Sequence, residues 1–443
     1  MTDQPADKAV LPYVRGAPVA PRPAPVSERG IIGWIHANLF STWLDALLTL
    51  VGLYVVVSVA WMVIDWAILR ATWSGANREA CLSSDPNLPA GACWAFVRAK
   101  FSQWVYGLYP IEERWRVNLV YVIGALALAP MMIPRVPYKR ANAVFLLAVY
   151  PVLTLILLDG GRFDIDLESW LWLLGLLAAA LVVIVFLAKV AGIIDLAPAL
   201  RGWVITAVSL IFLYAVLGFD FGLRHVETAL WGGLLVTLVV AITGMVASLP
   251  LGILLALGRR SRLPVVRLFS VMFIELWRGV PLITVLFMAS VMLPLFMPEG
   301  SSVDKLLRAL IGVALFTAAY MAEVIRGGLQ AIPKGQYEAA EALGLSYWRK
   351  MRLIVLPQAL RIVIPGIVNS FISLFKDTTL VSIIGIFDLL GILHAGLADA
   401  NWSTPQTAAT GYFAVALIYW LFCFSISRYS IFMERRLGAG FKR

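Results

Sequence analysis

The sequence predicts an all-α integral membrane protein with about ten transmembrane helices. Mean hydropathy is +0.85, 61% of the residues are hydrophobic and only 14% are charged. A soluble core of this length cannot bury so much apolar surface. Apolar stretches of about 20 residues, long enough to cross a hydrocarbon layer of about 30 Å, recur along the chain. Because backbone polar groups in lipid must be satisfied within the segment, we expect each stretch to be helical.

The expected spans follow directly from these stretches. They are 44–66, 117–134, 143–158, 170–190, 203–219, 230–257, 268–296, 307–325, 362–390 and 409–431. Before them, residues 1–40 are rich in Pro and Ala and are expected to form a disordered cytoplasmic tail, with no cleavable signal peptide. Residues 41–225 then form an N-terminal extension of about five spans with a long loop at 67–116, and residues 226–443 hold the other five.

The distribution of cations predicts the orientation. With both termini in the cytoplasm, four basic groups fall inside: Arg135, Lys139 and Arg140; Arg259, Arg260, Arg262 and Arg267; the segment 338–361; and Arg435, Arg436, Lys442 and Arg443. The loop 67–116 carries six Lys or Arg, but long loops count little for topology. The net charge of +10 is therefore interpreted as a topology signal, and no nucleic-acid partner is expected.

Cys81 and Cys93 both lie in the loop 67–116, which this orientation places outside. An oxidising periplasm would allow them to form a disulfide, whereas an inverted topology would leave two free thiols.

Several chemistries are missing from the sequence. The three histidines, His36, His225 and His394, are widely separated, and no cluster has the spacing of metal ligands. No GxSxG elbow and no GxxxxGK(S/T) phosphate loop occurs. If ATP drives this protein, another chain must bind it.

The stretch "EAAEALGLSYWRKMRLIVLPQALR", residues 338–361, is a hydrophilic interruption between spans. We expect Pro333 to Gly335 to break the preceding helix, and a new helix to place Glu338 and Glu341 in its early turns, where the helix dipole favours anions. Ala340 and Gly344, four residues apart, share a face that is bare enough for close approach.

A second short helix should follow this one. Gly344 suits a C-terminal cap, Ser346 an N-terminal cap, and Pro357 is expected to end the second helix. The product is a cytoplasmic helical knob, which indicates a docking element.

"GQYEAAEALGL" followed by "LPQALR" resembles the EAA loop of ABC importer permeases, and "FIELWRGVPLITVLF", "TAAYMAEVIRGGLQAIPKGQ" and "LFKDTTLVSIIG" are similar to the members that import polar amino acids. The resemblance runs from about Trp231 to the C-terminus. It implies a type I permease core of five spans in residues 226–443, with the EAA loop at 333–361. The coupling residues it implies are Gly335, Glu338, Ala339, Ala340, Gly344, Leu356 and Pro357.

The long extension resembles the M-type permease of general L-amino-acid (Aap/Bzt-type) importers. The resemblance therefore implies a subunit of the bacterial inner membrane that is not itself an enzyme. Its partners would be a homologous Q-type permease, a dimer of ATPases that bind ATP and Mg, a periplasmic amino-acid-binding protein and membrane lipid. The substrates implied are polar L-amino acids, and the chain itself would hold no cofactor.

Charged residues inside the predicted spans are the candidates for a substrate path, because each costs about 2.5–3.5 kcal/mol near the bilayer centre unless it faces protein or water. Glu275 and Arg278 are three residues apart on one helix and are expected to neutralise each other. An amino acid needs one donor and one acceptor, which this pair offers. For this pair we favour a purely structural role in fixing helix register or a dimer interface, because it lies near the expected cytoplasmic end of its span.

The other candidates lie in later spans. Lys376, Asp377, Thr378 and Thr379 form a polar island that either lines the path or holds structure. Glu323 and Arg326 either gate the path or reach the membrane surface with their long side chains. Tyr320 and Asn369 are lesser candidates, since polar groups between helices often serve packing.

Two other classes of function remain as alternatives. An ion-coupled secondary amino-acid transporter would also place carboxylates in the membrane, but such carriers typically have two related halves, and residues 1–225 hold no second "EAA" or "RGVPL". A membrane scaffold without transport has no positive support. Which amino acids are carried, which permease subunit holds them and what the N-terminal helices do stay open.

Overall fold

The computed structural model describes residues 30–82, 89–133, 136–161, 167–190, 197–296 and 303–438. Within these ranges the chain is built of helices, and its only strand-like features are three isolated backbone bridges. The predicted all-α class is confirmed. By backbone contacts, Met1–Ala71 and Thr72–Arg443 form two compact units.

The first unit holds α1 (Gly30–Leu39) and α2 (Trp43–Ile64), which a π-helical turn extends to Leu69. Thr42 caps α2, since its hydroxyl accepts a hydrogen bond of 3.1 Å from the Asp45 backbone N–H. The prediction of an unfolded tail over 1–40 is wrong for α1, whose stretch is free of proline and rich in Ile. The rest of that tail lies outside the described residues.

The second unit begins with the extension and continues into the core. The extension contains α3 (Trp94–Tyr106), α4 (Arg114–Met132), α5 (Lys139–Val144), α6 (Tyr150–Asp159), α7 (Leu167–Val190) and α8 (Ala197–Leu217). The core contains α9 (Gly233–Arg259), α10 (Pro264–Gly279), α11 (Leu282–Phe287), α12 (Lys305–Ala331), α13 (Lys334–Ala342), α14 (Tyr347–Lys350), α15 (Leu356–Ile362), α16 (Ile364–Asp377), α17 (Leu389–Leu397) and α18 (Pro405–Gly438).

Nine helices of the described chain are long and apolar enough to cross a membrane, or ten if one bent pair is a single span. The bent pair covers the expected span 268–296, and its axis turns by 102° between α10 and Leu282–Phe296. Pro281 lies at the bend, where it lacks the N–H that a continuous helix needs.

The expected span 362–390 is also divided. The α-helix α16 gives way to a 3₁₀ helix, Thr378–Ile384, and the chain turns at Gly385, which has a φ of +73°. Asp388 then caps a separate helix, α17.

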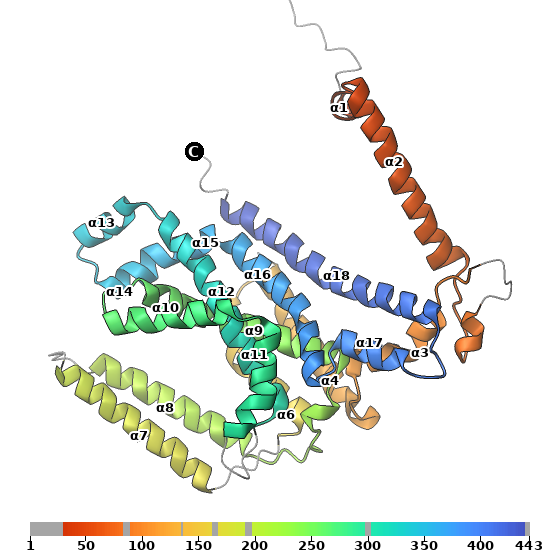
Figure 1. Cartoon of the computed structure of the whole chain (residues 1–443). Helices are drawn as coiled ribbons and strands as arrows, with labels where there is room; N and C mark the ends of the chain where they lie inside the picture. The colour runs from red at the N-terminus through yellow and green to blue at the C-terminus, as the bar shows by residue number, and fades with distance from the viewer. Residues whose placement is uncertain are drawn as a thin grey trace, which may run out of the picture. The chain divides into compact units, whose positions relative to one another are not determined.

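The core is centred on α9 packed along α12 (Figure 1). Small residues permit this contact: a Cβ added to Gly252 would lie 2.8 Å from the Cβ of Met321, and one added to Gly244 would lie 3.1 Å from Val313. A similar approach joins α12 to α15, where Gly328 faces the backbone of Ala359. The contacts at Gly252 and Gly244 therefore keep α9 and α12 close together.

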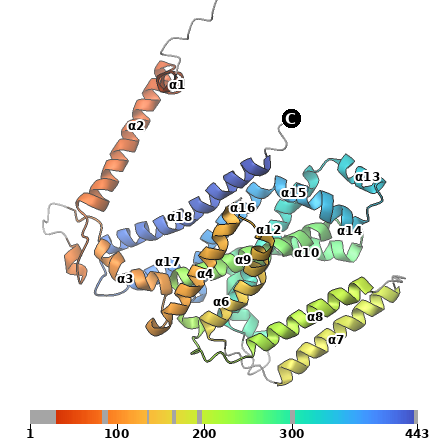
Figure 2. The same cartoon turned by 180° about the vertical axis from the view of Figure 1, so that it is seen from behind.

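The extension packs more loosely. Tyr150 of α6 lies over Gly124 of α4 and donates a hydrogen bond of 3.0 Å to the Val120 carbonyl, so α4 and α6 form a pair (Figure 2). In contrast, α7 and α8 contact each other through Trp170 and Tyr214, whose ring centroids are 4.8 Å apart, and expose most of their apolar side chains. Such surfaces suit lipid or another subunit.

Opposite ends of the α9–α12 pair meet different structures. The start of α9 contacts the end of α3, where a Cβ added to Gly233 would lie 2.2 Å from the carbonyl oxygen of Trp104. Beyond its other end, Arg260 donates a hydrogen bond of 3.1 Å to the carbonyl of Leu329 near the end of α12. At about 1.5 Å per residue each of these 27-residue helices is about 40 Å long, enough to cross a bilayer.

Candidate functional site

The connection between α12 and α16 forms the predicted helical knob. Pro333 is the N-terminal cap residue of α13, and Gly344 ends the helix in the left-handed conformation with a φ of +69°. The Leu345 N–H donates to the Ala340 carbonyl at 3.2 Å and the Gly344 N–H to the Glu341 carbonyl at 2.9 Å. These two bonds satisfy the last carbonyls of α13, so the chain reverses direction at Gly344 as the sequence predicted.

Three details of the knob differ from expectation. Because α13 begins at Lys334, Glu338 is its fifth residue and Glu341 lies in its last turn, so neither carboxylate benefits from the N-terminal dipole. Ser346 starts α14 without a side-chain capping bond. Pro357 does not end a helix; it occupies the first turn of α15, where a missing N–H costs nothing.

A network of polar contacts fixes the knob to the core. Arg260 donates a hydrogen bond of 3.1 Å to the Tyr337 hydroxyl and stacks over that ring, and the same hydroxyl donates to the Leu329 carbonyl at 3.1 Å. From the other side, the buried Lys350 pairs with Glu341 and also lies over the Tyr337 ring, 5.9 Å from its centroid. The ends of α9, α12 and α13 are thereby joined through one tyrosine.

The candidate coupling residues divide between two surfaces. Ala340 is 1% exposed, Leu356 packs partly against the neighbouring core cluster, and neither presents a free side chain. The remaining candidates are exposed, together with Leu343 at 76%; they are Gly335, Glu338, Ala339, Gly344 and Pro357. Ala340 therefore lets the rest of the knob approach α13, while the opposite side of α13 is available to another protein.

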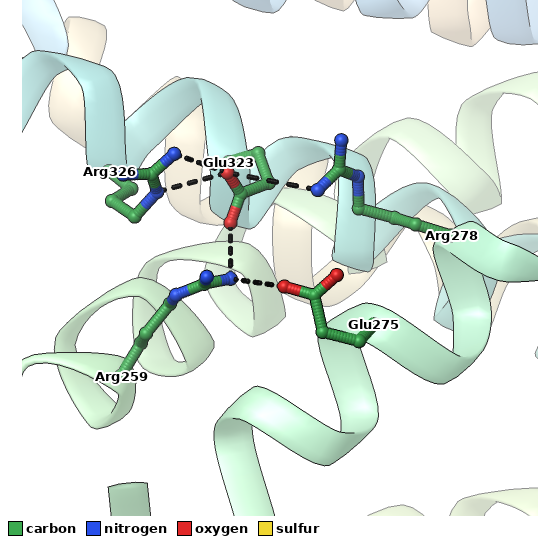
Figure 3. Close-up of polar contacts among 5 residues, drawn as sticks. All are labelled: Arg259, Glu275, Arg278, Glu323 and Arg326. Atoms are coloured by element: carbon green, nitrogen blue, oxygen red, sulfur yellow. Dashed lines mark hydrogen bonds and ion pairs between the residues drawn. The ribbon is translucent and has the colours of Figure 1, made fainter.

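A charge cluster links α9, α10 and α12 close to the knob (Figure 3). Glu323 of α12 lies at its centre, with its side chain 16% exposed. One of its oxygens accepts from Arg259 at 2.7 Å, and the other accepts from Arg326 at 2.7 Å. The Arg278 guanidinium is 3.8 Å from that second oxygen.

The predicted pair between Glu275 and Arg278 does not form. Glu275 instead accepts from Arg259 at 3.0 Å, and Arg278 points toward Glu323 and over the Tyr320 ring, 5.7 Å from its centroid. The cause is the tertiary structure. Arg259 of α9 lies beside Glu275, and Glu323 of α12 lies beside Arg278, so each residue has a partner that an isolated α10 would lack. In the sequence Arg259 indicates only the orientation of the chain, but in the structure it bridges Glu275 and Glu323.

The polar island on α16 is open to the outside of the chain on one side. Lys376 and Asn369 are exposed, and since they are seven residues apart they lie on the same face of α16. Thr378 and Thr379 instead turn back to the backbone, donating to Phe375 O at 2.9 Å and Lys376 O at 3.0 Å.

The structural pairing of Lys376 with Asp377 is not found, because no ion pair joins these two described residues; as neighbours on a helix they point in different directions. Asn369 and Lys376 thus present a polar face that this chain itself does not cover.

The buried Asp388 is not among the residues that the sequence predicted for a site. Asp388 is fully buried, and its carboxylate accepts hydrogen bonds of 2.9 Å from both the Gly391 N–H and the Tyr419 hydroxyl. Burial raises the pKa of this carboxyl. The adjacent Leu389 N–H donates to Thr237 Oγ1 at 3.0 Å, so this point joins α9, α17 and α18. An Asp directly before an apolar run is a helix-start signal, which the expected span 362–390 concealed.

Within the ranges that the structure describes, no three His, Cys, Asp or Glu residues are grouped so as to hold a metal ion. The arrangement offers a docking helix, a charge cluster and a polar helix face.

Comparison with known proteins gives a consistent assignment. Residues 248–438 match the family model of the binding-protein-dependent transport system inner membrane component. The chain is 44% identical over 420 residues to the inner membrane amino-acid ABC transporter permease protein YhdY of Escherichia coli (strain K12), covering 95% of this chain and 96% of that protein. It is 43% identical over 440 residues to the glutamate/glutamine/aspartate/asparagine transport system permease protein BztC of Rhodobacter capsulatus, covering 96% and 98%.

A shorter relative aligns with less than half of this chain. The probable amino-acid ABC transporter permease protein YckA of Bacillus subtilis is 36% identical over 200 residues, which is 85% of that protein but only 45% of this chain. More than half of this chain therefore has no counterpart in that relative.

We predict that Glu323→Gln destabilises the protein more than Glu275→Gln. Glu323 is the shared partner of three arginines and is largely buried, so its loss should lower the free energy of unfolding by about 2 kcal/mol. Glu275, with a side chain 55% exposed, should cost less than about 1 kcal/mol. Thermal unfolding of the purified variants in one detergent measures both, and equal losses would refute the central role of Glu323.

The knob should also respond to pH. The hydrogen bond from Lys350 holds the pKa of the Glu341 carboxyl below its ordinary value. Their ion pair therefore stabilises the turn fully above the ordinary glutamate pKa of about 4.3, and this stabilisation is lost as the pH falls through the lower pKa of the folded state. Hydrogen exchange of the Gly344 and Leu345 amides, corrected for intrinsic rates, should show protection falling over this window.

The matched variant for that measurement is Lys350→Met, which removes the cation and keeps an apolar stem. Its exchange profile should lose the acid-dependent step, and a profile identical to that of the unmodified protein would contradict the assignment.

Proposed function

Because this chain belongs to the family of amino-acid ABC transporter permeases, the inner membrane components of binding-protein-dependent transport systems, we propose that it couples ATP hydrolysis in a partner subunit to the import of polar L-amino acids. The chain is a multi-pass inner membrane protein and a permease subunit, not an enzyme. A separate ATPase and a substrate-binding protein are its partners in general. ATP and Mg are held by that ATPase, and this chain holds no cofactor.

The observation that carries the proposal is the joint around Tyr337. It connects the exposed helix α13 to the ends of α9 and α12, so a force applied to α13 reaches the spans without passing through a loose loop. The ATPase docks on the exposed side of α13, around Glu338, Leu343 and Gly344. Gly335, Ala339, Ala340, Leu356 and Pro357 shape and support this contact.

The orientation follows from this docking. The α13 end of α9 and α12 is cytoplasmic and the α3 end is periplasmic, and α18, which begins near α3, returns the C-terminus to the cytoplasm. The N-terminus is placed inside by the cation distribution.

The charge cluster acts as a latch between α9, α10 and α12. Separating its three arginines from its two glutamates would leave unpaired charges in a low-dielectric region. The cytoplasmic ends of the three helices therefore move together. Glu275, Arg278, Tyr320 and Glu323 are assigned to this latch at the cytoplasmic end of the path.

The substrate passes along the uncovered face of α16. Lys376 supplies a cation for the α-carboxylate and Asn369 supplies hydrogen bonds, while Asp377, the next residue along the helix, is the candidate acceptor for the ammonium group at the edge of this face. Thr378 and Thr379, bonded to the backbone, keep the helix in shape there. Since this face is open to the outside of the chain, a second permease closes it.

That second subunit is a homologous Q-type permease, and this chain is the M-type partner. The substrate class is the acidic amino acids and their amides, supported by the name of the relative from Rhodobacter capsulatus. Nothing in the comparisons supports the ion-coupled secondary transporter considered from the sequence.

The test of this function is copurification from the native membrane. The tagged full-length chain should bring with it a second permease and an ATPase, and ATP hydrolysis should rise when a binding protein loaded with glutamate or glutamine is added. Isolation of this chain alone, competent for uptake under an ion gradient in liposomes, would overturn the proposal.

Glu338→Ala should uncouple ATP hydrolysis from uptake. The side chain is exposed and outside the Tyr337 joint, so folding and thermal stability should stay unchanged, while uptake falls by about tenfold or more. The control is Gln336→Ala, which lies on the other side of α13. Uptake and hydrolysis are measured in the same proteoliposomes, and equal uptake by both variants would contradict docking at Glu338.

A further inference from the structure

Residues 72–82 and 89–107 form a folded cap on the extension that includes α3. Cys81 and Cys93 are joined by a disulfide that closes its loop, with the two Cα atoms 5.5 Å apart. The Thr72 N–H donates to Ala92 O at 2.8 Å and the Ala95 N–H donates to Thr72 O at 3.1 Å, which ties the beginning of the cap to the start of α3.

The cap is attached to the connection between α17 and α18. Lys100 pairs with Asp399 at 2.7 Å, and both side chains are less than one-third exposed. The Arg78 backbone N–H donates to Asn401 O at 2.7 Å. The Cys93 N–H donates to the hydroxyl of Thr410 on α18 at 2.8 Å. These contacts hold the connection between α17 and α18 at Asp399 and Asn401, and α18 itself at Thr410.

Apolar contacts fill the same interface. Phe96 is fully buried between α3 and α17, with its ring centroid 5.9 Å from that of Trp402. A Cβ added to Gly411 would lie 3.2 Å from the Phe96 ring and 2.5 Å from Leu393, so α18 is pressed against both. Figures 1 and 2 show α3 beside α17 and the start of α18.

The end of α3 also meets the start of α9. A Cβ added to Gly107, whose φ is +65°, would lie 2.3 Å from the Cα of Gly232. Gly233 in turn donates its N–H to Phe387 O at 2.9 Å, just before the buried Asp388. The cap therefore contacts the periplasmic ends of α9, α17 and α18 together, at the end opposite to α13.

We propose that this cap, residues 72–82 and 89–107, is a clamp that fastens the periplasmic ends of α9, α17 and α18 into one block, so that this subunit moves as a unit when α13 is driven. The transport part of this proposal rests on the proposed function. The clamp gives α3, and not the other helices of the extension, a role in coupling.

Hydrogen exchange of the full chain in nanodiscs tests the clamp without any partner. Reducing the disulfide with a phosphine, or the pair Cys81→Ser and Cys93→Ser, should speed exchange across Leu397–Thr404 by about tenfold or more. Lys100→Met removes only the ion pair and should speed it by about two- to fivefold. The control is Arg98→Met, which removes an exposed cation from the same helix.

A charge reversal makes the test specific. Lys100→Asp alone should loosen the connection, and adding Asp399→Lys should restore its protection. Exchange changes confined to residues 72–93, or identical rates for Lys100→Met and Arg98→Met, would overturn the clamp.

The second readout is the number of amino acids taken up per ATP hydrolysed by the copurified complex. Lys100→Met should lower this ratio while Arg98→Met leaves it unchanged, and an unchanged ratio with faster exchange would overturn the role in coupling. If no ATPase copurified, the proposed function would fail while the exchange experiment still decided the clamp.

Discussion

Close packing between α9 and α12 is the constraint on which the rest of this structure depends. Gly252 and Gly244 remove the side chains that would separate the helices, so that both run across the membrane at short distance. In lipid no hydrophobic driving force brings helices together, and small residues that allow close contact supply most of the attraction. Any element that touches one end of this pair is mechanically connected to the other end.

At the α13 end of this pair, that connection consists of polar contacts that lipid would not tolerate unpaired. Glu323 and Arg259 neutralise each other across two helices, and the neighbouring Arg260 reaches Tyr337 on α13. Adjacent arginines at the end of one helix thus serve two partners, one within the core and one in the docking knob. The helix α13 is therefore held by the same end of α9 that takes part in the charge cluster.

At the α3 end of the pair, the connection is made largely by backbone and by a disulfide-closed cap. Glycines at 107, 232 and 233 allow three chain segments to meet, and Asp388 is buried among hydrogen-bond donors rather than among cations. One end of the α9–α12 pair is thus held by ion pairs, and the other end by close packing at glycines and by hydrogen bonds. The helices α7 and α8, which make few contacts with the core, take no part in either.

The sequence by itself determined the membrane class, nearly all of the spans and the position of the docking knob, because composition, span length and the Pro and Gly residues around Glu338 act locally. It also placed Gly344 correctly, since a helix ending in the left-handed conformation depends on that residue alone. Two expected spans are interrupted because Pro281 and Gly385 break helices inside apolar stretches whose hydropathy does not change. Only the tertiary structure decided the partners of the charged residues: Glu275 pairs with Arg259 of α9 and not with Arg278 of its own helix, because the neighbours of a side chain in a helical bundle come from other helices. The same reason applies to α3, whose contact with α17 and α18 joins residues about 300 positions apart and leaves no local pattern in the sequence.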